Sequence, residues 1–90
     1  EFQDIEMKRY IIVVESGFVF VGDMQPYGKE EHSIRVENAK NIRKFGTTNG
    51  IGQLALTGKT NTTVLDNVGT LHINTNKILF LIEVDPNVDL

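Results

Sequence analysis

Short segments in which apolar and polar residues alternate recur along the chain, and this pattern predicts strands. Residues 9–15 and 77–84 carry apolar side chains on both faces, which is typical of strands that are buried on both sides. Residues 18–24 follow the first of these after a Ser16-Gly17 turn, so the two segments are an expected hairpin. Gly22 inside the second strand indicates a bulge or a close backbone contact.

The middle of the chain continues with short strands separated by turns. Turns are expected at Asn38-Ala39 and around Asp66-Asn67, where small and polar residues interrupt the apolar pattern. The strands expected beside these turns cover residues 31–37, 40–45, 62–65 and 68–73.

One segment between the strands has helical spacing, and it predicts a helix of at most two turns near residues 50–57. Its apolar face consists of Ile51, Leu54 and Ala55, at positions i, i+3 and i+4. The residues expected at its ends are Thr48 or Asn49 as the N-cap and Gly58 after the last turn.

Together these elements predict a mainly β protein with one short α-helix, built as a small antiparallel β-barrel or curved sheet of about six short strands. The length of 90 residues allows one domain. Residues 7–85 are its expected extent, with 1–6 as a disordered leader or vector remnant and 86–90 as a tail. Two strands that are apolar on both faces exceed what one helix covers, so a homo-oligomer is expected.

The composition limits the kinds of functional site that the chain can carry. The chain has no cysteine, which excludes disulfides and thiolate metal sites and agrees with a cytoplasmic protein. No apolar run approaches the 18 residues of a membrane span. The two histidines are far apart, neither serine lies in a nucleophile elbow, and the acids are scattered. We therefore expect no enzyme, no metal and no cofactor.

Charge is spread unevenly along the chain. The net charge is −3, yet residues 32–60 hold five basic residues and one acidic residue. An acidic chain with a basic middle disfavours general nucleic-acid binding and permits a local site for an anion. The alternative is that these charges only solvate exposed strand faces.

Gly58-Lys59-Thr60 has the spelling with which a phosphate-binding P-loop ends. That motif needs a glycine at position 53, where this chain has Gln53, and it must follow a strand and open a helix. Here the predicted helix precedes Gly58, and a helix C-terminus repels phosphate. The P-loop interpretation is therefore rejected.

A better anion site is expected at the start of the helix. Backbone N–H groups and threonine hydroxyls of a Gly- and Thr-rich turn can bind a phosphate or carboxylate, and basic side chains lie nearby in the sequence. The alternative is an ordinary capped turn. The predicted ligand-binding residues are Arg35, Arg43, Lys44, Thr47, Thr48, Asn49 and Gly50.

Residues 36–58 carry a spacing of small and apolar residues that is shared with known sequences. The matching positions are Ala39, Ile42, Gly46, Leu54, Ala55 and Gly58, with "GFVFVGDM" before them and "ILFLIEV" after them. On these residues, over about residues 8–84, the chain resembles a family of small, uncharacterised phage and prophage β proteins. The family's tryptophans are replaced here by Arg43 and Phe45. The resemblance implies a phage or mobile-element origin and a small β fold, and it transfers no catalytic residue.

The sequence leaves two functions open. The first is a non-enzymatic accessory protein that acts by binding, for instance a counter-defence protein that sequesters a nucleotide-like anionic ligand or a host factor in the host cytoplasm. The second is a phage structural or assembly protein that works through subunit packing.

Overall fold

The computed structural model describes residues 7–25, 32–48 and 50–90. The expected leader 1–6 lies outside the described residues. The described elements are the strands β1 (Lys8–Val14), β2 (Val19–Met24) and β3 (Ser33–Lys44), the helix α1 (Ile51–Thr57), the strand β4 (Val64–Asn74), a 3-10 turn (Thr75–Lys77) and the strand β5 (Ile78–Glu83).

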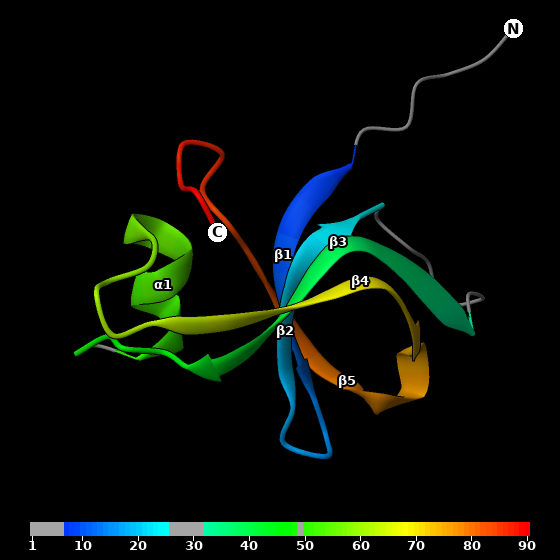
Figure 1. The fold of residues 1–90 in the computed structure, drawn as a ribbon. Coiled ribbons are helices and arrows are strands. Elements are labelled where there is room, and N and C mark those ends of the chain that lie inside the picture. The colour runs from blue at the N-terminus through cyan, green and yellow to red at the C-terminus, as the bar shows by residue number, and fades with distance from the viewer. Residues whose placement is uncertain (1–6, 26–31, 49) are drawn as a thin grey trace, which may run out of the picture.

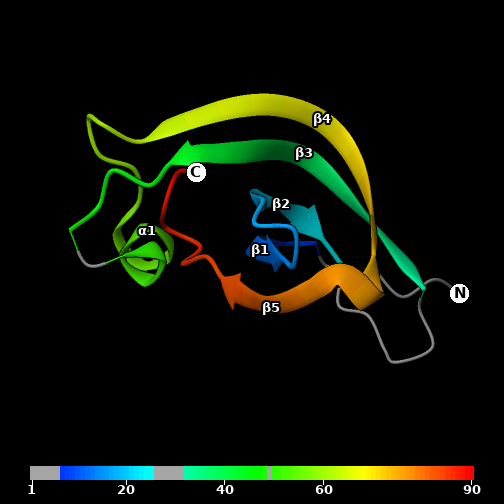
Figure 2. The same cartoon turned by 90° about the horizontal axis from the view of Figure 1, so that it is seen from below.

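The five strands form one antiparallel sheet in the order β4-β3-β2-β1-β5 (Figure 1). Figure 2 shows β3 and β4 arching together over β1 and β2, with β5 on the opposite side. The predicted fold class, mainly β with a curved antiparallel sheet and one helix near 50–57, is confirmed, with five strands in the described residues where about six were expected.

The expected turns at Asn38-Ala39 and Asp66-Asn67 are wrong, because β3 and β4 each run through them as one long strand. Asn38 instead has a left-handed φ of 52°, and the pairing of β3 with β4 shifts register between Val36 and Ala39. Gly69, which pairs with Ala39, has a φ of 92°. A bulge of this kind bends a strand without ending it. The turn signals therefore mark a bend shared by two strands.

The apolar residues on both faces of β1 belong to two separate cores. Ile11 lies in a core covered by α1, together with Leu54 and Ala55. Ile12 and Val14 lie in a second core, which includes residues from both arching strands, Ile34, Val36 and Ile73. The helix α1 thus covers one face of β1. The second face of β1 is covered by the same chain, so its apolar residues do not require another subunit.

A polar cluster holds the bulge of β3 against the first hairpin. Arg9 donates hydrogen bonds to the Asp23 carboxylate at 2.9 Å and to the Asn38 carbonyl at 3.2 Å. The Asn38 amide donates to the other Asp23 oxygen at 3.2 Å. Arg9 also donates to the Leu90 carbonyl at 2.8 Å, which ties the chain end to the sheet.

Gly22 lies in β2 beside the bulge, where β3 approaches closely. A Cβ atom at this position would overlap Val36 Cγ1 and would lie 3.2 Å from Ala39 Cα. The prediction of a close backbone contact at Gly22 is confirmed.

We expect Gly22→Ala to lower the free energy of unfolding by about 1–3 kcal/mol, because the added methyl overpacks the bulge. Urea denaturation measures this change. The matched control is Gly52→Ala in α1, where an added Cβ meets nothing within 4 Å and helix propensity raises stability by up to about 1 kcal/mol. Equal effects of the two substitutions would contradict the proposed packing at Gly22.

Candidate functional site

The helix start uses its hydroxyl groups internally. The N-cap residue is Gly50, and no side chain caps the helix. The prediction of Thr48 as the N-cap is therefore wrong, and the alternative, Asn49, lies outside the described residues. Thr47 Oγ1 donates to the Gly50 carbonyl at 2.7 Å, and Thr48 Oγ1 donates to Gln53 Oε1 at 3.3 Å. These two hydroxyls hold the turn and are already engaged.

The two predicted arginines lie apart, and each has an acidic partner. Arg43 forms two hydrogen bonds with the Asp66 carboxylate, at 3.0 and 3.1 Å. This hydrogen bonding, followed by the charge of Asp66, raises the pKa of Arg43. Arg35 pairs with Glu37 at 3.4 Å, and it precedes Arg43 by eight residues, about 26 Å of extended strand on the other side of the bulge.

Of the predicted set, the structure brings together the turn residues Thr47, Thr48 and Gly50 near the end of β3. Lys44 ends that strand with an exposed side chain, and it forms no ion pair within the described residues. Arg35 does not join this group. The predicted residues therefore do not form one cation-rich pocket.

The Gly58-Lys59-Thr60 segment is a helix stop, which agrees with rejection of the P-loop. Gly58 has a φ of 89°, and its N–H donates to the Leu54 carbonyl at 3.0 Å. Thr60 Oγ1 then donates to the Gly46 carbonyl at 2.6 Å, and Thr63 Oγ1 donates to the Phe45 carbonyl at 2.6 Å. The hydroxyls thus tie the segment entering β4 to the segment leaving β3.

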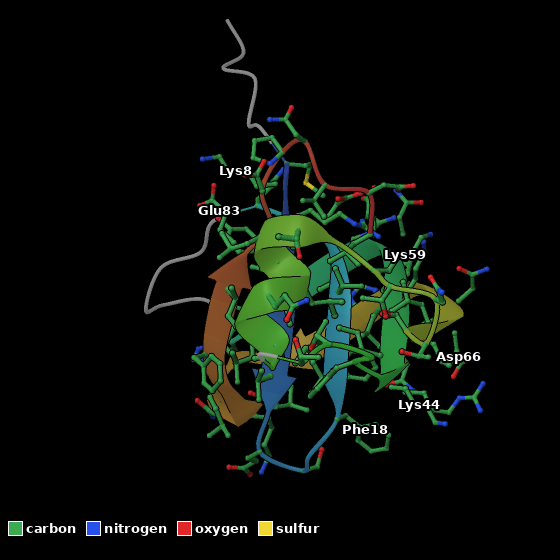
Figure 3. All side chains as sticks on the ribbon, turned by 90° about the vertical axis from the view of Figure 1, so that its left-hand side faces the viewer. Lys8, Phe18, Lys44, Lys59, Asp66 and Glu83 are labelled. Carbon is green, nitrogen blue, oxygen red and sulfur yellow. The ribbon has the colours of Figure 1, made fainter. Side chains whose placement is uncertain are left out.

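Two other basic residues do share a groove. A groove of about 290 Å³ lies between the entry to β4 and the middle of β3. Its lining residues are Lys40, Lys59, Thr63, Leu65 and Asn67. We name it the two-lysine groove. Figure 3 shows Lys59 on the same side of the molecule as Asp66 and Lys44.

The site residues predicted from the sequence include neither Lys40 nor Lys59. The β3–β4 register, in which Lys40 lies opposite Asn67, would have brought Lys40 near the segment that carries Lys59. That register was hidden because the turns expected at Asn38-Ala39 and Asp66-Asn67 broke both strands.

The two outer strands of the sheet are open. β4 pairs only with β3, and β5 pairs only with β1, within the part of the chain that the structure describes. Leu79 and Phe80 of β5 are 62% and 49% exposed, and Val68 of β4 is 41% exposed. Both open edges therefore present large apolar side chains.

Nowhere in 7–25, 32–48 and 50–90 do three His, Asp or Glu side chains gather as metal ligands would. Over the same ranges, no helix has the length and apolar character needed to cross a membrane.

Comparison with solved structures shows the fold. The chain is similar to a heptameric archaeal Sm protein, described for its implications for the eukaryotic snRNP core, with a TM-score of 0.58 and 15% identity over 87% of each chain. It is also similar to the SmAP1 heptamer of P. aerophilum, with a TM-score of 0.57 and 15% identity over 87% of this chain and 80% of that one. No family model matches the chain. No curated protein matches its sequence.

We expect Thr63→Val to lower the free energy of unfolding by about 1–2 kcal/mol, because it leaves the Phe45 carbonyl without its donor. The substitution also removes the acceptor of the Thr60 N–H, which bonds Thr63 Oγ1 at 2.8 Å. Chemical denaturation checks the size. Thr70→Val is the control, since Thr70 is exposed on β4. If Thr70→Val lowers the free energy of unfolding as much as Thr63→Val does, the hydrogen bond from Thr63 to the Phe45 carbonyl does not contribute the expected stability.

Proposed function

We propose that this chain is a non-enzymatic binding protein that assembles into closed homo-oligomers through the open edges of its sheet. The observation that carries the proposal is the pair of uncovered edge strands. β5 has no charged residue from Ile78 to Ile82, and its Leu79 and Phe80 face solvent. Proteins usually protect an open edge with lysine, proline or a covering segment. An uncharged apolar edge is therefore best explained by a partner strand.

The two edges differ, and this difference favours a ring. When β4 of one copy pairs with β5 of the next, the contact is head to tail and repeats from copy to copy. Such a contact closes into a ring when the rotation between copies allows it. Both of these similar proteins are heptamers, which supports a closed assembly for this curved sheet.

The ligand in this proposal is a small anionic, nucleotide-like molecule, and the two-lysine groove is its site. Lys40 and Lys59 approach this groove from different segments, and Asn67 adds a polar group. The Thr63 hydroxyl is engaged by the Phe45 carbonyl, and Lys40 Nζ also donates to the Leu90 carbonyl at 3.4 Å. The similarity to a protein discussed with the snRNP core, a ribonucleoprotein, opposes the expectation that nucleic-acid binding is unlikely. Short single-stranded RNA therefore belongs among the ligands to be tested.

The biological setting in the proposal rests on the resemblance to phage and prophage proteins. In that setting the oligomer acts as a counter-defence protein in the host cytoplasm, where it sequesters its ligand. The second candidate is a phage assembly protein, and the exposed Leu79 and Phe80 favour it as well. An oligomer that binds no nucleotide and no RNA would support this second candidate.

We expect the wild-type protein to be a stable oligomer by light scattering and native mass spectrometry, and Leu79→Glu to shift it to smaller species. A charge placed on the apolar edge must be desolvated when the neighbouring strand pairs. The matched control is Leu56→Glu, which places the same charge on a leucine of α1 that is 68% exposed and belongs to neither edge strand. A wild-type monomer at every concentration would refute the assembly.

We expect nucleotides or short single-stranded RNA to raise the melting temperature of the wild-type protein. Ligand at 100 times its Kd stabilises a folded protein by about 2.7 kcal/mol. Replacing both Lys40 and Lys59 with Gln should abolish the shift, whereas Lys8→Gln on β1 should not.

A second pair of substitutions separates the two candidate sites. If Arg43→Gln and Thr47→Val abolish the shift and the lysine substitutions do not, the ligand binds at the helix start. If neither class of ligand shifts the melting temperature, the nucleotide version of the proposal is wrong.

A further inference from the structure

We infer that the pocket beside the β1–β2 turn binds the flat ring of a nucleobase. This site is distinct from the two-lysine groove and shares no lining residue with it. It lies within one chain, so it does not depend on the proposed assembly. The pocket has a volume of about 640 Å³, which suits a small organic ligand.

The walls of the pocket are held in place by hydrogen bonds. The Val14 N–H donates to the Phe18 carbonyl at 3.1 Å, and the Gly17 N–H donates to the Val14 carbonyl at 3.0 Å. The Glu15 N–H donates to the Lys77 carbonyl at 2.8 Å, and Lys77 Nζ donates to Glu15 Oε1 at 2.9 Å. The turn and the start of β5 are thus tied together, and the pocket is preformed.

A stacked aromatic pair lines one side. The ring centroids of Phe18 and Phe20 lie 6.0 Å apart, with an angle of 14° between the planes. Phe20 packs against the second core, whereas Phe18 is 57% exposed. Figure 3 shows Phe18 at the end of the sheet opposite Lys8 and Glu83. The anchored ring fixes the plane of the exposed ring, which can then extend the stack with a planar ligand.

The remaining lining residues select the chemistry of that ligand. Leu71 and Ile73 form an apolar wall, and Ser16, His72 and Asn74 place hydrogen-bonding groups on the lining. The acid among the lining residues, Glu15, is paired with Lys77, so their charges cancel.

These features fit an uncharged flat ring with hydrogen-bonding edges. Aromatic side chains bind nucleobases by this combination of stacking and edge contacts. An alkyl chain would leave the polar groups without partners, and a phosphate would find no unpaired lysine or arginine among the lining residues. The base can come from a free nucleotide or from single-stranded RNA, since both present the same ring.

The test uses the full chain and two probes, adenosine monophosphate and a single-stranded adenosine hexanucleotide, with affinity measured by calorimetry. We expect Phe18→Leu to weaken binding of at least one probe by about 10-fold or more, because leucine keeps the apolar contact and removes stacking. The control is Leu56→Ala, which shortens an exposed apolar side chain of α1 outside the pocket.

Each outcome is informative. Phe18-dependent binding of the mononucleotide identifies a free nucleotide as a sufficient ligand, and Phe18-dependent binding of the hexanucleotide alone identifies RNA. Both results support the inference. It is overturned if neither probe binds, if Phe18→Leu binds as the wild type does, or if Phe18→Leu changes only the oligomeric state. Repeating the titration in Leu79→Glu separates this site from assembly, since the pocket persists in a single chain.

Discussion

The bulge of β3, where β3 lies close to β2 and shifts its register with β4, determines the shape of this protein. Gly22, Asn38 and Gly69 lie on adjacent strands beside the register shifts of the sheet. Asn38 and Gly69 adopt left-handed φ values, and Gly22 leaves room for Val36 by lacking a side chain. Because the interior is close-packed, a side chain at Gly22 would push β3 away and open the bend. The Arg9–Asp23–Asn38 cluster then fixes the bulge from the surface.

The bend explains how a 90-residue chain buries both faces of β1. A flat five-strand sheet would leave one face to the single short helix and the other to solvent. Here the arching half of β3 and β4 supplies the second cover, through residues such as Ile34 and Ile73. The small domain thereby builds two cores on one sheet. Chains of this size are otherwise short of buried apolar surface.

Much of this fold could be predicted from local patterns. The spacing of Ile51, Leu54 and Ala55 located the helix, and the apolar residues on both faces of 9–15 located a strand covered on two sides. The bend could not be predicted in this way. A positive φ at Asn38 is compatible both with a turn that reverses the chain and with a bulge inside a continuous strand. Only the pairing with a strand some 30 residues later, in which Ala39 meets Gly69, distinguishes them.

The same limit applies to the candidate site. Arg43 had the charge for an anion site, but its partner Asp66 lies 23 residues away and reaches it only across the β3–β4 ladder. Lys40 likewise lines the two-lysine groove because β3 pairs with β4, which places Lys40 opposite Asn67. Charge composition predicts how many cations a segment holds, whereas strand pairing decides which of them are neutralised.

The bend forms a pocket without closing the sheet into a barrel among the described residues. Since β3 and β4 fold over β1 and β2, β4 approaches the β1–β2 turn, where Leu71 and Ile73 meet Phe18 and Phe20. This approach forms a pocket, but β4 forms no ladder with β5 among the described residues. Had the two edges paired within one chain, the apolar side chains of β5 would have had a cover. The bend therefore accounts for the pocket, while the edges that it leaves unpaired are those that a second copy can extend.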